Sequence, residues 1–249
     1  MESLTDESFA EGCDAPGDAG ERAEPTRAAV PSYLLDHYWW AYVHPRAVRF
    51  FERQWLVDAI LWGNYRRLRD LALDDLGSAL PGRTLQVACA YGDFTHELSA
   101  RAARGGGALD VIDALPIQID NLRAKLAGGP PVRAQVMDAA DMTFADASFD
   151  RAVLFFLLHE QPADFRRRTI SETLRVVKPG GRIVIVDYAP PARFNPMRYL
   201  MRPVLARLEP FALDLWREDI AAFAPPAWSQ AMRPQRYFGG LYQKVTLTR

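Results

Sequence analysis

The sequence predicts an α/β protein with one doubly wound, mostly parallel sheet of seven strands. Two observations support this fold class. Between residues 81 and 188, short apolar runs alternate with amphipathic helical segments, and strands separated by helices of this length pair in parallel through right-handed crossovers. Near the end of the chain, two strand-like runs flank Gly239-Gly240, which predicts an antiparallel C-terminal hairpin.

The segment that precedes the predicted sheet in the sequence predicts an N-terminal helical cap over residues 31–80. From Pro45 to about Leu76 apolar side chains recur at helical spacing, and proline suits the first helical position. We therefore expect one long or broken amphipathic helix. The first 30 residues carry eight acids, two arginines and almost no large apolar side chain, which predicts a disordered acidic leader.

The elements of the sheet domain, residues 81–249, follow from the same periodicities. An insertion at about residues 190–232 separates the fifth strand from the hairpin, and Asn195-Pro196 predicts a helix cap and a first helical position within it. This insertion is long enough to form a lid or to face a membrane. The predicted strands are residues 83–88, 108–113, 132–136, 149–156, 181–188, 236–238 and 242–248, and the predicted helices are residues 94–103, 116–126 and 163–177.

Composition limits the classes of protein to which the chain can belong. The longest uninterrupted apolar run, residues 152–158, is far shorter than the roughly 20 residues that span a bilayer, so we expect no transmembrane segment. Cys13 and Cys89 form no spaced framework, which is typical of a reducing compartment such as the cytoplasm. The acidic leader has the pattern of neither a secretory signal nor a mitochondrial transit peptide.

Acidic residues follow two neighbouring strands of the predicted sheet. An open α/β sheet binds ligands at the carboxyl ends of its strands, where the strand order reverses. Asp113 ends the second strand about 20 residues after the first turn, where such folds place a carboxylate on ribose hydroxyls. Asp138-Ala139 follows the third strand, a position suited to the edge of an adenine. Each aspartate alone is equally typical of a helix cap, but together they favour a bound adenosine.

Four stretches of the sequence resemble one class of enzymes. The stretches "LQVACAYGDFTHEL", "VIDALP", "MDAADMTFADASFDRAVLFFLLHEQP" and "TLRVVKPGGRIVIVDY" resemble class I S-adenosylmethionine-dependent methyltransferases of the branch that modifies quinones. The run "RVVKPGGRIVIVD" is specific to that class, whereas a nicotinamide enzyme is not expected to end in a hairpin. The resemblance implies S-adenosylmethionine as the cofactor, with Phe155 beside it as well as Asp113, Asp138 and Ala139.

The turn after the first strand departs from the pattern of that class. The turn normally reads acid-x-Gly-x-Gly-x-Gly, and the corresponding residues here are Gln86, Ala88, Ala90 and Gly92. With "YLLDHYWWAYVHPRAVRFFERQWLVDAILWGNYRRLRD" upstream, the altered turn is similar to the rhodoquinone biosynthesis proteins, the RquA family, and the resemblance then covers roughly residues 33–188. That family implies a role in anaerobic respiration. It also implies a reaction in which an amino group replaces a methoxy group of ubiquinone, with S-adenosylmethionine as the source of the nitrogen and with assistance from Mn²⁺.

The altered turn suggests a physical reason for a change of reaction. A carboxylate beside an amine favours the charged ammonium, but a nucleophilic amine has to be unprotonated, and an α-amino group has a pKa near ~8. Gln86 removes that negative charge, and the methyl groups of Ala88 and Ala90 are expected to reposition the methionine arm. Tyr91 adds a phenol. The alternatives are a quinone or phenol methyltransferase that tolerates a poor glycine turn, and a non-catalytic scaffold that binds quinone.

Candidate metal ligands and catalytic residues follow the fourth and fifth strands. His159-Glu160 comes directly after the fourth strand, and imidazole and carboxylate suit manganese, although a solvent-facing loop pair is the alternative. Asp93 and Asp187 are further candidate ligands. Tyr91, His159 and Asp187 are the candidate catalytic residues, and the sequence does not decide which of them is the base.

Aromatic and basic segments predict contact with an apolar substrate and with a membrane. The aromatic residues either form a cap packed on the sheet or line an entrance for a flat head group and an isoprenoid tail. The arginines stand among apolar residues without acids, which suits an anionic membrane surface such as the inner face of a bacterial inner membrane, or else a solvated helix face. The aromatic group is Tyr38, Trp39, Trp40 and Tyr42 with His37 and His44, and the arginines are Arg193, Arg198, Arg202 and Arg207.

Overall fold

The computed structural model describes residues 30–38 and 44–249. The predicted acidic leader lies outside the described residues except for Val30, and so do Trp39, Trp40 and Tyr42. The expectations for these residues remain predictions.

One seven-stranded sheet organises the described chain, in the order β3-β2-β1-β4-β5-β7-β6. Strands β1 to β5 are parallel, and β7 is antiparallel to both β5 and β6. This arrangement confirms the predicted fold class. The strands are β1 (Arg83–Val87), β2 (Ala108–Asp113), β3 (Val132–Val136), β4 (Phe149–Phe155), β5 (Val177–Tyr188), β6 (Pro234–Tyr237) and β7 (Tyr242–Thr248).

The fifth strand is longer than predicted. It begins at Val177, because Val177 pairs with Phe149 ahead of a break in the β4–β5 register at Arg151. The Lys178-Pro179-Gly180-Gly181 run that resembles a turn therefore lies inside the strand's bounds.

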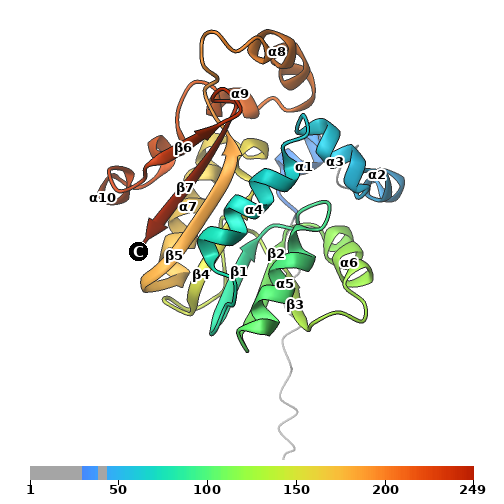
Figure 1. The fold of residues 1–249 in the computed structure, drawn as a ribbon, viewed down its shortest axis with the longest axis vertical. Coiled ribbons are helices and arrows are strands. Elements are labelled where there is room, and N and C mark those ends of the chain that lie inside the picture. Colours follow the sequence, from blue (N-terminus) through green and yellow to red (C-terminus); the bar gives the residue numbers. More distant parts are fainter. Residues whose placement is uncertain (1–29, 39–43) are drawn as a thin grey trace, which may run out of the picture.

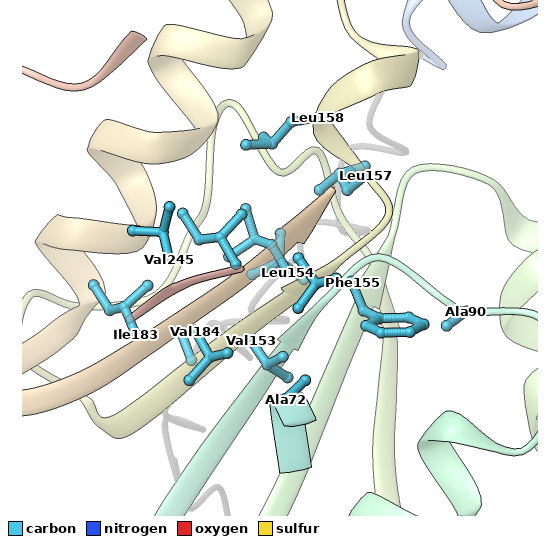
Figure 2. Packing of buried hydrophobic residues seen from close by; sticks show 14 of the residues in the cluster. Ala72, Ala90, Val153, Leu154, Phe155, Leu157, Leu158, Ile183, Val184 and Val245 are labelled. Atoms are coloured by element: carbon cyan, nitrogen blue, oxygen red, sulfur yellow. The ribbon is translucent and has the colours of Figure 1, made fainter. Parts of the chain in front are cut away.

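Helices cover both faces of the sheet. Figure 1 shows α4 (Tyr65–Leu76) and α5 (Phe94–Arg104) in front of the sheet and α7 (Ala163–Val176) behind it, with α6 (Pro116–Lys125) beside β3 and β2. The central strands are buried on both faces. Figure 2 shows Val153 of β4 and Val184 of β5 beside Ala72 of α4, and all three are fully buried.

The predicted long helix before the sheet is broken into three. Helices α2 (Pro45–Phe51) and α3 (Gln54–Ile60) precede α4, and a shorter helix α1 (Ser32–His37) precedes them. The first break is at Arg53, whose backbone is extended. The second is at Trp62 and Gly63, whose φ angles of 54° and 73° end the helical run. The cap can therefore fold around the end of the sheet instead of extending as one rod.

The insertion contains α8 (Met197–Leu208), α9 (Ala212–Leu215) and α10 (Pro226–Ser229). Helix α8 begins at Met197, one residue later than predicted, with Pro196 as its N-cap. Asn195 still binds the start of the helix, because its Oδ1 accepts a hydrogen bond from the Met197 amide at 3.0 Å. The indole of Trp62 donates to the sulfur of Met201 at 3.1 Å, so the cap and the insertion meet at one end of the sheet (Figure 1). Among the described helices, none is both long and apolar enough to span a bilayer.

Candidate active site

A first cavity lies at the carboxyl ends of β1 to β4, where the strand order reverses between β1 and β4. Its volume, open mouth included, is about 610 Å³. Both polar and apolar side chains line it. They are Tyr33, Leu34, Ala88, Cys89, Tyr91, Ile112, Asp113, Ala114, Leu115, Gln118, Met137, Asp138, Ala139, Phe156, Leu157, Glu160 and Gln161.

Asp113 lines this cavity at the end of β2. Its Oδ2 accepts a hydrogen bond from the Cys89 amide, and its Oδ1 accepts one from the Leu115 amide, each at 2.9 Å. These bonds fix both carboxylate oxygens and leave each with a lone pair for a ligand hydroxyl. Burial raises the pKa of Asp113 to about 6, so the carboxylate is ionised at neutral pH.

Asp138 and Ala139 line the same cavity after β3, where the sequence predicts contacts with an adenine. Oδ1 of Asp138 accepts a hydrogen bond from the Ala140 amide at 2.8 Å, which holds the loop in place. A carboxylate with free lone pairs, a polar loop and apolar walls such as Met137 and Leu115 fit the ribose and base of S-adenosylmethionine.

Two residues of the altered turn, Ala88 and Gln86, differ in their position relative to the cavities. Ala88 has a φ of 71°, a left-handed conformation that costs an alanine about 1 kcal/mol, and it lines the first cavity. Gln86 is buried beneath the turn and lines neither of the two cavities of the site. Its Nε2 donates to the Ala88 carbonyl at 2.9 Å, a bond that an ionised glutamate cannot make. Gln86 therefore acts on the turn through the backbone.

Gly92 also lies away from both cavities, against the N-terminal cap. Its φ is +77°, and a Cβ there would lie 2.8 Å from the Tyr65 hydroxyl and 2.9 Å from Gln54 Oε1. The surviving glycine of the turn is thus required by the cap. Lys125 secures the same turn, because its ammonium donates to the Ala90 and Gly92 carbonyls at 2.9 and 3.1 Å.

A second cavity adjoins the first and is lined mainly by apolar side chains. Its volume, open mouth included, is about 780 Å³. It shares Cys89, Tyr91, Phe156 and Glu160 with the first cavity, so the two meet at these residues. The other lining residues are Phe51, Val57, Ile60, Leu61, Tyr65, Ala90, Phe155, His159, Tyr188 and Glu209.

Tyr91 stands at the junction of the two cavities. Its hydroxyl accepts a hydrogen bond from Gln118 Nε2 at 2.9 Å, and its ring stacks on Phe51 at 6.0 Å. Burial raises the pKa of Tyr91 above its ordinary value, so its hydroxyl stays protonated at neutral pH. Tyr91 is therefore placed to position groups and to donate a hydrogen bond.

His159 lines the second cavity and is held by Asp187. Its Nδ1 lies 3.0 Å from Asp187 Oδ1, while Asp187 Oδ2 accepts from the amides of Leu158 and His159 at 2.8 and 3.2 Å. Burial lowers the pKa of His159, but the Asp187 carboxylate outweighs it and raises that pKa to about 9. Asp187 itself lines neither cavity and orients the imidazole.

The expected manganese site lacks a ligand set in the described part of the chain. No group of three histidine, cysteine, aspartate or glutamate side chains converges there. The His159 Nδ1 faces Asp187, and its Nε2 lies 3.8 Å from Glu160 Oε1. The described residues therefore do not support a metal site at His159, Glu160 and Asp187, and Asp93 is paired with Arg69.

The remaining predicted residues have structural contacts. Phe155 lines the second cavity, not the first, and its ring stacks on Phe94 at 4.2 Å. Tyr38 is fully buried and packs on Phe211, and His44 caps α2, so these two residues favour the packed cap. The ring of His37 also contacts Phe211, at 5.2 Å.

Sequence reasoning missed the residues that the cap and the insertion bring to the second cavity. Phe51, Ile60 and Leu61 come from the cap, and Glu209 comes from the insertion. One signal was present for Glu209, because it is the first acid after the arginine-rich segment 190–208. No local pattern indicates that its carboxyl turns inward.

Comparisons with known proteins agree with this geometry. Residues 84–181 match the family model of a methyltransferase domain. The chain is 33% identical over 155 residues to a demethylmenaquinone methyltransferase of Renibacterium salmoninarum, covering 60% of this chain and 61% of that protein. It is 30% identical over 192 residues to a demethylmenaquinone methyltransferase of Thermus thermophilus, covering 73% of this chain and 83% of that protein. The matched region is thus less than two thirds of the Renibacterium relative.

Solved structures show the same fold. A SAM-dependent methyltransferase from Aquifex aeolicus superimposes with a TM-score of 0.51 at 18% identity, covering 82% of this chain and 97% of that one. The N-methyltransferase NodS from Bradyrhizobium japonicum gives a TM-score of 0.52 at 17% identity, covering 73% and 93%. The chain has the class I methyltransferase fold and matches 83% of the Thermus relative at 30% identity. The chain therefore belongs to the demethylmenaquinone methyltransferase family.

Proposed function

We propose that this chain transfers a group from S-adenosylmethionine to the ring of a lipid-soluble quinone, with ubiquinone as the substrate. The junction of the two cavities at Tyr91 carries this proposal. The first cavity has the side chains for an adenosine, and the second has apolar walls suited to a ring with an isoprenoid tail. Relatives named for quinone biosynthesis support the same substrate class.

Two reactions are consistent with such a site. Methyl transfer is the reaction named in the relatives, and the comparisons support it more directly than any other. Amination, which yields rhodoquinone, is supported by this chain's own departures from the glycine turn. We propose amination as the reaction, with methyl transfer as the second candidate.

The conformation of Ala88 supports amination. A residue at φ 71° is best served by glycine, yet this chain keeps a methyl group there, on the wall of the first cavity. Such strain persists at positions where it serves a function. S-adenosylmethionine, when bound, would supply its α-amino nitrogen to the ring carbon from which methoxide leaves. Release of the aminoquinone would then need an elimination, in which the nitrogen keeps the electron pair of its bond to the α-carbon and the β-carbon gives up a proton, leaving an unsaturated sulfonium product. The altered turn would hold the methionine arm in a different position from that in methyltransferases, and Gln86 stands where those enzymes have an acid.

Protonated groups at the second cavity supply the electrophilic assistance that this reaction needs. The imidazolium of His159 lines that cavity, and the Tyr91 hydroxyl lies at its junction with the first. A hydrogen bond from either group to a quinone carbonyl draws electrons from the ring and favours attack by an amine.

The surface around the second cavity supports peripheral contact with a membrane. Ile60 lines the cavity and is also exposed, so the cavity opens beside α3. Trp55 of α3 is 61% exposed, and Phe194 and Tyr199 of the insertion are 86% and 72% exposed. The segment 190–208 adds four arginines and no acid. Aromatic and basic side chains together suit an interface with anionic lipids, where a quinone tail would lie.

Replacing Arg202 and Arg207 by glutamine should weaken binding to vesicles of anionic phospholipid about 30-fold at low salt. Each charge near such a surface contributes about 1 kcal/mol, and both side chains are exposed. Sedimentation with vesicles measures the change. The matched control replaces Arg104 and Arg123, which are exposed on α5 and α6, and should bind as the wild type does. Equal binding by both double variants would refute docking through α8.

Product mass separates the two candidate reactions. Purified protein, S-adenosylmethionine and a short-tailed ubiquinone should yield a product lighter than the substrate, because an amino group is lighter than a methoxy group. Methyl transfer needs a quinone with a free ring position, and a parallel incubation with a short-tailed demethylmenaquinone would then give a heavier product. If both quinones stay unchanged, both candidates are overturned, and binding without catalysis is left.

A further inference from the structure

The carboxyl group of Glu209 lines the second cavity, and the mechanism above does not use it. Glu209 is the C-cap residue directly after α8. Its amide donates to the Leu205 carbonyl at 2.8 Å, and its own carbonyl accepts from the Ala212 amide at 3.0 Å. The backbone that carries this side chain is therefore fixed on both sides.

One oxygen of the Glu209 carboxyl is left without a partner. Oε2 is buried and forms no hydrogen bond within residues 30–38 and 44–249. A buried polar atom without a partner costs stability, and such atoms in native proteins point to a missing ligand, water or ion. Burial raises the pKa of Glu209, and the nearby His159 opposes that rise. The Tyr38 hydroxyl also interacts with this carboxyl and lowers its pKa, so Oε2 is the unsatisfied polar atom on an otherwise mainly apolar wall.

A buried arginine fixes Glu209 relative to His159. Arg166 of α7 is fully buried, and its Nε donates to the Leu158 carbonyl at 2.8 Å, next to His159. Its Nη2 donates to the Phe211 carbonyl at 3.0 Å, two residues after Glu209. The same guanidinium therefore ties the loop after β4 to the insertion, so that two polar groups face one cavity from separate elements.

We propose that Glu209, in its protonated form, donates a hydrogen bond to a carbonyl oxygen of the quinone and so selects substrates that carry a carbonyl at that position. This inference rests on the proposed function, since it assigns a further contact to the same cavity. It makes the insertion part of the substrate site. It also explains why a carboxyl group is held among apolar residues such as Val57 and Leu61.

The test measures binding of ubiquinone with a single isoprenoid unit, by quenching of tryptophan fluorescence. Glu209→Leu removes the hydrogen bond and should weaken binding roughly tenfold, whereas Glu209→Gln keeps a hydrogen-bonding group of the same size and should bind close to the wild type. Glu218→Leu is the matched control, because Glu218 is exposed on the same insertion and lines neither cavity. Glu209→Ala gives the same comparison if the leucine variant does not fold.

Two further measurements test whether Glu209 acts on the quinone in the second cavity and not on S-adenosylmethionine. All variants should keep their affinity for S-adenosylmethionine, because Glu209 does not line the first cavity. Dimethoxytoluene, which has methoxy groups but no carbonyl oxygen, should bind equally to the wild type and to Glu209→Leu. Equal binding of the quinone by these two proteins would overturn the assignment of Glu209 and leave the proposed function intact. Failure of the wild type to bind the quinone would overturn the proposed function itself.

Discussion

Replacing His159 by phenylalanine should lower the turnover of quinone by about a hundredfold or more, with the affinity for S-adenosylmethionine unchanged. A positioned proton donor contributes roughly 10²–10⁴ in rate, and His159 is the imidazolium on the wall of the second cavity. It does not line the first cavity. Steady-state turnover and calorimetry with S-adenosylmethionine measure the two effects. The control is His96→Phe, because the side chain of His96 is 58% exposed on α5.

The pH dependence of turnover tests the same role. Asp187 raises the pKa of His159 to about 9, so the imidazole is protonated below that pH and loses its proton as the pH rises through it. Wild-type turnover should therefore fall above about pH 9. His159→Phe should lack this falling limb. A variant that keeps wild-type turnover, or a wild type whose turnover is flat through this range, would remove His159 from the chemistry.

Replacing Asp113 by alanine should weaken the binding of S-adenosylmethionine by about 1.5–3 kcal/mol, roughly 10- to 150-fold, because hydrogen bonds to a charged acceptor are lost. The fixed orientation of both oxygens by the Cys89 and Leu115 amides makes Asp113 the best-prepared acceptor in the first cavity. Calorimetry measures the change. Asp141→Ala is the control, since Asp141 is exposed and lines neither cavity.

The raised pKa of Asp113 adds a pH test of cofactor binding. Its carboxylate is ionised above about pH 6 and takes up a proton below it. Wild-type affinity for S-adenosylmethionine should therefore decline as the pH falls through about 6, and Asp113→Ala should show no such decline. If the affinity of the alanine variant matched that of the wild type, Asp113 would not contact the cofactor.

The sequence predicted the parts of the fold that depend on local periodicity. The bounds of β2, β3 and β7 agree with the predicted ranges, and Asp113 and Asp138 lie on one cavity because the ends of parallel strands share one edge of the sheet. The break of the cap at Gly63 was less predictable, because an apolar pattern continues across it.

Side-chain partners from distant segments could not be predicted. The adjacent pair His159-Glu160 suggested two metal ligands, but the imidazole is held by Asp187, 28 residues away. Gly92 was expected to face the cofactor, yet it makes room for Tyr65 of the cap. Glu209 reaches the cavity only because the insertion folds back over the strand ends. Each of these contacts depends on tertiary packing, which no local pattern in the chain encodes.

The most direct test of amination is to determine which atoms of S-adenosylmethionine enter the quinone. S-adenosylmethionine labelled with heavy nitrogen at its α-amino group and with heavy carbon at its methyl group should be incubated with the protein and ubiquinone, with unlabelled ammonium and glutamine in excess. Mass spectrometry of the quinone should then find the nitrogen label in the product and the carbon label absent. An aminoquinone that carries unlabelled nitrogen would contradict amination by S-adenosylmethionine. So would a ubiquinone that stays unchanged while a demethylmenaquinone, which has a free ring position, takes up the methyl label.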